Sequence, residues 1–164
     1  MTEQLTHIDP KLFEILETVS DPEIPVLSIV EMGVVRSAQM VENVAEIVIT
    51  PTYSGCPAMD VIGEDIKLAF KQKGIEAKVA LVLSPAWTTD WITPKGRKAL
   101  EKYGIAAPLE ADKEALLGNK KLVKCPQCQS TNTKLVSQFG STACKALFQC
   151  EDCLEPFDYF KCLK

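Results

Sequence analysis

Four cysteines near the C-terminus have the spacing of a metal site. They form two Cys-x-x-Cys pairs, Cys125 with Cys128 and Cys150 with Cys153, separated by twenty-one residues. Two thiolates converge from each turn, and two such turns at the tips of two hairpins close a tetrahedron. Four sulfur ligands without histidine suit Zn²⁺, with iron as the usual alternative, and a closed four-thiolate site is structural rather than catalytic. The spacing therefore predicts a structural zinc ribbon.

Four further residues bear on this prediction without providing ligands. Gln129 and Leu154 follow the second cysteine of each pair, where ribbon turns often have glycine, so we expect slightly less favourable turns. Cys144 has the strand parity of a buried position, which favours a small hydrophobic role, and Cys162 follows an aromatic run. A second soft-metal contact by Cys144 and Cys162 stays open, as does the alternative of two separate redox pairs.

The seventh cysteine, Cys56, stands alone where the turn TYSGCP meets a helical pattern. Pro57 in the first helical turn would put Cys56 at or beside the N-cap, where the helix dipole and unpaired N–H groups favour a thiolate. Asp21, Glu23, Thr50 and Thr52 could converge from neighbouring loops as oxygen partners. Two interpretations stay open: a compact residue beside the cap, or a functional thiol that reacts or binds a metal.

Two tryptophans, Trp87 and Trp91, lie in a threonine-rich loop that follows a predicted strand. Large apolar rings often anchor protein interfaces, although tryptophan is also common in cores. We interpret the loop as a candidate partner surface.

The composition argues against several classes of function. His7 is the single histidine, which removes most mechanisms that need imidazole as a base or ligand. The net charge is −4, and residues 105–164 hold eight lysines against seven acids, so no basic footprint for nucleic acid is present. The chain also lacks a Glu-x-x-His pair for a diiron site, the plant-type ferredoxin spacing and a glycine-rich dinucleotide loop.

No apolar run approaches the roughly 20 residues that span a bilayer, and the first thirty residues do not resemble a secretory signal. We therefore expect a cytoplasmic protein that is not bound to a membrane. In that compartment, seven cysteines indicate metal or thiol chemistry rather than a disulfide framework.

These candidate residues must be positioned by two different kinds of structure. Residues 1–105 predict an α–β–β–α–β–α order, hence a small α+β domain with a sheet covered by helices. Residues 106–121 lose the core pattern and are interpreted as a linker, and residues 122–164 predict a β-rich ribbon that needs a metal to fold. The expected elements are a helix capped by Asp9, an extended stretch around Gly33, a strand at 43–50, a helix from Pro57 to Gly74, a strand at 75–83 and a basic helix ending near Gly104.

Two stretches resemble the small α/β domain of the iron–sulfur assembly family. They are DPEIPVLSIVEMGVV (21–35) and ITPTYSGCPAMDVI (49–62). The family's Asp-Pro-Glu turn and its Thr…Cys-Pro turn match Asp21, Glu23, Thr50 and Cys56. The resemblance implies that Cys56 is a transient ligand of iron or of an iron–sulfur cluster.

Nearly the whole chain also resembles the family of D components of bacterial phenylacetyl-CoA epoxidase systems. The resemblance rests on LSPAWTTDWITPKGRKALEKYGIA (83–106) joined to FGSTACKALFQCEDCLEPFDYFKC (139–162). It implies a part in aerobic phenylacetate catabolism, alongside diiron oxygenase subunits and an iron–sulfur flavin reductase. The resemblance further implies that such a D component helps to mature a metal centre of the complex and is not a catalytic part.

The leading hypothesis is therefore an accessory protein for iron or iron–sulfur assembly in the epoxidase, without a catalytic residue of its own. The alternative is a non-catalytic structural subunit or interaction module of the same complex, with the tryptophan loop in its interface. A nucleic-acid-binding ribbon and a thiol oxidoreductase are less well supported by the residues. The oligomeric state stays open, including a homo-oligomer.

Overall fold

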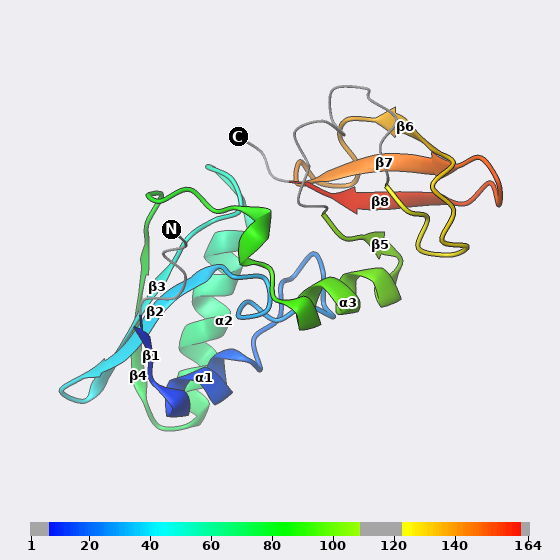
Figure 1. The fold of residues 1–164 in the computed structure, drawn as a ribbon. Helices are drawn as coiled ribbons and strands as arrows, with labels where there is room; N and C mark the ends of the chain where they lie inside the picture. The colour runs from blue at the N-terminus through cyan, green and yellow to red at the C-terminus, as the bar shows by residue number, and fades with distance from the viewer. Residues whose placement is uncertain (1–6, 109–122, 162–164) are drawn as a thin grey trace. The chain divides into compact units, whose positions relative to one another are not determined.

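The computed structural model describes residues 7–108 and 123–161. The chain divides into two compact units, Met1–Gly96 and Arg97–Lys164 (Figure 1). Each unit has its own four-stranded sheet. Cys162 and most of the predicted linker lie outside the described residues.

The N-terminal unit is built on a mixed sheet with the order β1-β2-β3-β4. β2 and β3 form an antiparallel hairpin, whereas β1 runs parallel to β2 and β4 runs parallel to β3. A parallel neighbour needs a crossover, which helix α2 provides between β3 and β4. The strands are β1 (His7–Ile8), β2 (Val35–Val41), β3 (Val44–Ile49) and β4 (Glu76–Leu81).

Two helices, α1 (Pro10–Leu16) and α2 (Ala58–Gln72), contact each other and the strands (Figure 1). The Asp9 side chain caps α1 by accepting a hydrogen bond from the Lys11 N–H at 3.0 Å. In α2 the apolar residues recur at helical spacing, and Ile62, Ile66 and Phe70 are buried. Their burial confirms the helical periodicity that the sequence shows.

Two details of this unit differ from the expectation. The short strand β1 has no sequence signal, because two residues cannot display an alternation. The extended stretch expected around Gly33 begins only at Val35. Gly33 itself has φ +74° in a turn, and a Cβ atom there would overlap the backbone oxygen of Trp91. Glycine is therefore required for a close backbone approach rather than for a strand.

After β4 the chain forms a short 3₁₀ helix, η1 (Thr89–Trp91), and then α3 (Pro94–Tyr103). Glu31, which is buried, ties this region to the turn that precedes β2. Its carboxylate lies 2.8 Å from the Lys95 ammonium and accepts a hydrogen bond from the Ser28 N–H at 3.1 Å. Its carbonyl accepts from the Thr93 N–H at 2.9 Å.

The C-terminal unit has a second sheet, with the order β5-β8-β7-β6. β7 pairs antiparallel with β6 and β8, and β5 runs parallel to β8. The strands are β5 (Ile105–Ala106), β6 (Thr133–Ser137), β7 (Lys145–Cys150) and β8 (Pro156–Phe160). Residues 105 and 106, which we expect at the end of the first domain and the start of the linker, thus belong to the ribbon's sheet.

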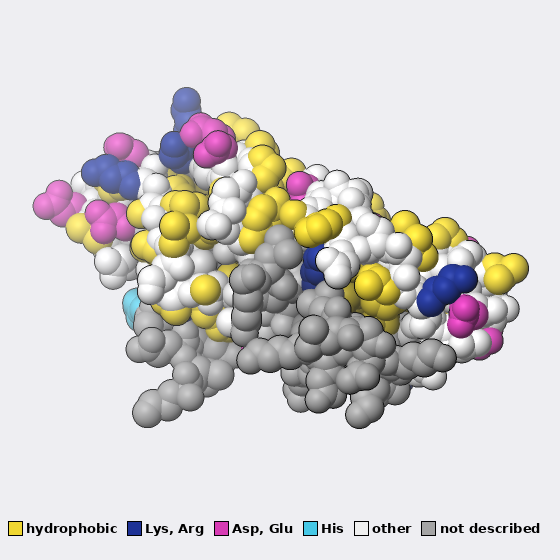
Figure 2. Space-filling view, turned by 90° about the horizontal axis from the view of Figure 1, so that it is seen from above, with side chains coloured by type: hydrophobic (Ala, Val, Ile, Leu, Met, Phe, Trp, Pro, Cys, Tyr) yellow, Lys and Arg dark blue, Asp and Glu magenta, His cyan; other side chains and the backbone are white. Residues whose placement is uncertain are grey.

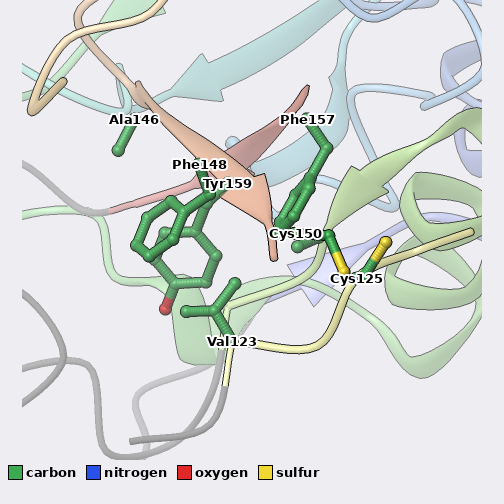
Figure 3. Packing of buried hydrophobic residues seen from close by; sticks show 8 residues of the cluster. Val123, Cys125, Ala146, Phe148, Cys150, Phe157 and Tyr159 are labelled. Carbon is green, nitrogen blue, oxygen red and sulfur yellow. The ribbon is translucent and has the colours of Figure 1, made fainter. Parts of the chain in front are cut away.

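The core of the C-terminal unit is a small cluster of buried side chains (Figure 3). The rings of Phe148 and Tyr159 meet edge to face with centroids 5.5 Å apart, and Phe157 stacks on Phe148 at 6.0 Å. Two of the cluster's members, Cys125 and Cys150, are cysteines. The core therefore runs directly into the predicted metal site.

One face of the molecule is drawn in space-filling form in Figure 2. On the face drawn in Figure 2, basic and acidic side chains are interspersed, and hydrophobic side chains reach the surface between them. Among the described residues, no helix is long and apolar enough to cross a lipid bilayer.

Candidate functional site

The structure brings the four ribbon cysteines together where β7 ends. Their sulfur atoms all lie within 4.8 Å of one another. The sulfurs of Cys125 and Cys153 are 3.6 Å apart, and those of Cys128 and Cys150 are 3.5 Å apart. A tetrahedral zinc with Zn–S bonds of about 2.3 Å needs sulfurs about 3.8 Å apart. The four thiols therefore form a metal site with dimensions that fit zinc.

Each cysteine pair is held by a turn of the same form. In the first turn, the Gln129 N–H donates to the Cys125 carbonyl at 2.9 Å, and the Cys125 N–H donates to the Ser130 carbonyl at 2.9 Å. The residue after the second cysteine of each pair, Gln129 or Leu154, has φ 63°. These are the two positions at which the sequence lacks the expected glycine, and both adopt the conformation that glycine would favour.

Asp152 joins the two turns, which the sequence does not predict. Its carboxylate accepts hydrogen bonds from the Ser130 hydroxyl and, at 2.8 Å, from the Asn132 amide. These two bonds hold the pKa of Asp152 below its ordinary value. Because Asp152 lies in the second pair's turn and its partners follow the first pair, the carboxylate fixes the two halves of the site to each other.

The pKa values of Cys150 and Cys153 are shifted in opposite directions, because each thiol lies close to other thiols and to backbone N–H groups. The hydrogen bond that the Cys153 N–H donates to the Cys150 sulfur is the largest effect on that thiol, and together with weaker hydrogen bonds it lowers the pKa of Cys150 to about 7. The Glu155 N–H lowers the pKa of Cys153, but loss of solvation and the neighbouring thiols raise it to about 12. Metal binding must therefore displace protons from this cluster.

Of the other two C-terminal cysteines, the structure describes Cys144, which is not among the four clustered thiols. Cys144 is buried, as expected for a small hydrophobic role, and its sulfur lies 3.1 Å from the Thr142 hydroxyl. Because Cys162 lies outside the described residues, a contact between the two stays untested.

Cys56 lies at the N-terminus of α2, directly before the N-cap Pro57. The turn reaches this position through Gly55, which has φ +81°. The side chain is partly exposed and lines an open cavity of about 430 Å³. The cavity lies between α2 and β4, and its other lining residues include Met59, Asp60, Lys67, Val79 and Leu81.

The electrostatics of Cys56 differ from the expectation of a partly ionised thiol. Burial raises the pKa of Cys56, the Ala58 N–H lowers it, and the Glu23 carboxylate raises it again. Hydrogen bonds from Tyr53 and Thr52 lower it by less, so the net shift is upward. The effect of the helix N-terminus is therefore outweighed, and the Cys56 thiol is protonated at neutral pH.

Besides Thr52, the predicted oxygen partners of Cys56 have different surroundings. Glu23 acts on Cys56 through its charge. Asp21 is buried and accepts hydrogen bonds from the N–H groups of Glu23 and Ile24 at 2.8 and 2.9 Å, so it shapes the loop that carries Glu23. Thr50 is buried, and within the described part of the chain its hydroxyl has no hydrogen-bond partner. Tyr53 is a neighbour of Cys56 that the sequence does not single out.

The two tryptophans do not form one exposed surface. Trp87 is only 3% exposed, and its indole N–H donates to the Met32 carbonyl at 3.0 Å, so it belongs to the core. Trp91 is partly exposed, and the Arg36 guanidinium lies 3.8 Å from its ring centroid. As a candidate partner surface, the loop is therefore reduced to Trp91, because Trp87 is buried.

Comparisons with known proteins bear on both units. Residues 10–82 match the model of the iron–sulfur cluster assembly protein family, and residues 110–161 match the PaaD zinc beta ribbon domain. The chain is 47% identical over 154 residues to the putative D component of the 1,2-phenylacetyl-CoA epoxidase of Escherichia coli (strain K12), covering 93% of this chain and 92% of the relative.

Two shorter proteins match the N-terminal part. An Fe–S protein maturation auxiliary factor of Bacillus subtilis (strain 168) is 35% identical over 88 residues, which are 52% of this chain and 85% of the relative. The crystal structure of a domain of unknown function, DUF59, from Bacillus anthracis is 33% identical with a TM-score of 0.51, over 55% of this chain and 88% of that one. Its fold agrees with the predicted assembly-type domain.

Proposed function

Because the chain belongs to the family of 1,2-phenylacetyl-CoA epoxidase D components, we propose that it is an accessory protein that helps to mature an iron or iron–sulfur centre of that enzyme. The match of residues 10–82 to the assembly family and the similarity to maturation auxiliary factors support this division of labour. Its partners are the diiron oxygenase subunits or the iron–sulfur flavin reductase, and it supplies no catalytic residue to the epoxidation.

The observation that carries the proposal is the position of Cys56. It is the single cysteine before residue 125, and it lies at an open cavity with Glu23 close enough to affect its charge. Thiolate is a soft ligand for iron, and a carboxylate beside it offers a hard oxygen. Cys56 and Glu23 thus form a small mixed donor set for a metal that is cargo.

The raised pKa of Cys56 suits a transient ligand. A protonated thiol is a poor nucleophile and is oxidised slowly while the site is empty. Arriving metal displaces the proton, and reprotonation favours release to the acceptor. Asp21 keeps the Glu23 loop in place through its two backbone hydrogen bonds.

The ribbon has a separate role in this proposal. Cys125, Cys128, Cys150 and Cys153 hold a structural zinc, which leaves no open position for a substrate. The ribbon then serves as a docking module for an epoxidase component, while Cys56 handles the cargo.

The test replaces Cys56 with serine, which is nearly isosteric but a poor soft-metal ligand. Cys56→Ser should leave the fold and one zinc per chain unchanged. Cells that express it should accumulate epoxidase with a depleted iron or iron–sulfur centre and at least about tenfold lower activity. Ser54→Ala, an exposed change in the same turn, is the control and should mature the enzyme normally.

A second arm separates maturation from catalysis. Cys56→Ser protein added to epoxidase that is already assembled should support full turnover. A defect in this arm, with normal metal content during assembly, would show a direct role in catalysis and refute the maturation proposal.

A further inference from the structure

One edge of the N-terminal sheet is formed by strand β4. β4 pairs with β3 on one side, and no strand within residues 7–108 and 123–161 pairs with its other side. The Val82 N–H donates to the Ile49 carbonyl at 2.9 Å, so even-numbered residues of this segment turn their backbone groups toward β3. The odd-numbered residues turn theirs outward, and these are Ala77, Val79, Leu81 and Leu83.

This edge carries one feature that can protect an exposed strand, the charged side chains of Glu76 and Lys78, but it lacks others. The segment 76–83 contains no proline, and its register with β3 is continuous from Glu76 to Leu81. Leu81 and Leu83 are 51% and 58% exposed. An apolar edge of this kind is a template for another strand.

We propose that β4 pairs with β4 of a second copy of this chain, antiparallel about a two-fold axis at Ala80. The two four-stranded sheets then join into one, and the same residues are used by both copies. The pairing satisfies the outward backbone groups of both edges and covers the exposed leucines.

The choice of a second copy rests on how well this edge complements itself. With Ala80 on the axis, Val79 lies opposite Leu81 of the second copy, and Ala77 lies opposite its Leu83, so every pair on the side that faces α2 is apolar. Odd residues meet odd residues, which antiparallel hydrogen bonding requires.

The charges fit the same register. Lys78 lies opposite Val82 of the second copy, and the two Lys78 positions are about 13 Å apart along the strands, so like charges do not meet. A register with Val79 on the axis would bring the two Lys78 side chains diagonally together and pair Leu83 with a residue that precedes the strand. The register at Ala80 is therefore preferred.

The pairing also has a consequence for Cys56. Val79 and Leu81 line the cavity beside Cys56, so the second copy would add an apolar wall at the open side of that cavity. This consequence rests on the proposed function, because it shields a metal at Cys56 from water, whereas the pairing itself does not depend on it.

The first experiment measures the mass of the zinc-loaded full chain by sedimentation over a roughly hundredfold concentration range. We expect a reversible dimer, and Leu81→Lys should raise its dissociation constant by about 100-fold because it places a charge in the apolar pairs. Leu68→Lys is the matched control, since Leu68 is 54% exposed on α2, away from the edge, and should leave the dimer intact. A wild-type monomer at every concentration, or equal loss in both variants, overturns the proposal.

The second experiment tests the register in a Cys56→Ser background, which keeps its outcome separate from metal transfer. Residues that face each other in a non-hydrogen-bonded antiparallel pair have Cα atoms about 4.5 Å apart, within reach of a disulfide. Ala80→Cys should cross-link two copies under mild oxidation, and Lys78→Cys on the same face should not. Equal cross-linking of both variants overturns the register. A monomer that binds an epoxidase component through β4 shows a different partner and overturns the proposal.

Discussion

The two units of this chain are held together by different physical means. The N-terminal unit buries a continuous apolar core between its sheet and α2, with Phe70 and Ile66 fully inaccessible. The cluster of the C-terminal unit has eight buried residues, two of which are cysteines of the metal site. The first unit should therefore be stable without metal, whereas the second should fold only when its thiolates are bound.

The variant with the largest expected effect on this difference removes one zinc ligand. Cys125→Ser should unfold the ribbon, because structural zinc sites contribute on the order of 10 kcal/mol to folding. The N-terminal unit should keep its native spectrum in the same molecule. Zinc stoichiometry and the dispersion of backbone amide NMR signals measure the two effects. Cys144→Ser, a buried cysteine outside the site, is the control and should keep its zinc. An ordered ribbon without zinc would contradict the comparison.

The reverse test weakens the other unit. Phe70→Ala removes a fully buried ring and should cost about 3–5 kcal/mol of the N-terminal unit's unfolding free energy. Zinc content should stay at one per chain, since no ligand is touched. Denaturant unfolding followed separately in each unit measures the loss. Leu68→Ala on the exposed side of α2 should change it by less than about 0.5 kcal/mol. Loss of zinc in Phe70→Ala would show that the units fold as one.

The sequence predicts the elements of the N-terminal unit well because their periodicities are long. The helix at 58–72 and the strands at 44–49 and 76–81 follow directly from apolar spacing. The two-residue strands β1 and β5 are too short to show a period, and they form because a neighbouring strand offers hydrogen bonds. Gly33 is misleading for a related reason, since its role is set by Trp91, far away in the chain.

In the candidate sites, too, the sequence predicts local features and misses those that depend on distant residues. The four ribbon cysteines can be predicted because ligand identity and spacing are local properties. Asp152 cannot, because its partners Ser130 and Asn132 lie twenty or more residues earlier. The pKa of Cys56 depends on burial and on Glu23, which no local pattern reveals, so a position beside a helix N-terminus gives the wrong sign.

A smaller effect concerns the pH dependence of the N-terminal unit. Burial raises the pKa of Glu31, but the hydrogen bond from Lys95, the Ser28 N–H and the Lys95 charge together hold it below its ordinary value. The ionised Glu31 carboxylate therefore stabilises the folded unit fully above the ordinary carboxyl pKa, and this stabilisation is lost as the pH falls through the lowered pKa of the folded state. Glu31→Gln should cost about 1 kcal/mol at neutral pH.

The measurement is the unfolding free energy of the N-terminal unit between neutral and acidic pH. Glu31→Gln should flatten its fall with acid, because the titrating group is gone. Glu46→Gln on β3 changes the same charge for a carboxylate that is not buried, so it serves as the control. If the unfolding free energy of wild type and Glu31→Gln falls equally with acid, carboxylates other than Glu31 determine the pH dependence of this unit.

The smallest effect concerns the turns of the metal site. Leu154 has φ 63°, where a non-glycine residue costs roughly 1–2 kcal/mol, whereas glycine loses about 0.5–1 kcal/mol more backbone entropy on folding. Its side chain is 67% exposed and contributes little packing. Leu154→Gly should therefore stabilise the zinc-bound ribbon by about 0.5 kcal/mol.

Gln129 has the same φ but differs in one respect. Its side-chain amide donates to the Pro126 carbonyl at 3.3 Å, so Gln129→Gly relieves the turn and also loses a hydrogen bond. We expect Gln129→Gly to leave the stability of the ribbon nearly unchanged and Leu154→Gly to raise it. The denaturation midpoint of the ribbon in excess zinc measures both effects. Leu154→Ala separates the causes, because alanine removes the side chain and keeps the unfavourable φ. A gain in Leu154→Ala equal to that in Leu154→Gly would show that the exposed leucine, rather than the backbone conformation, limits the stability of this turn.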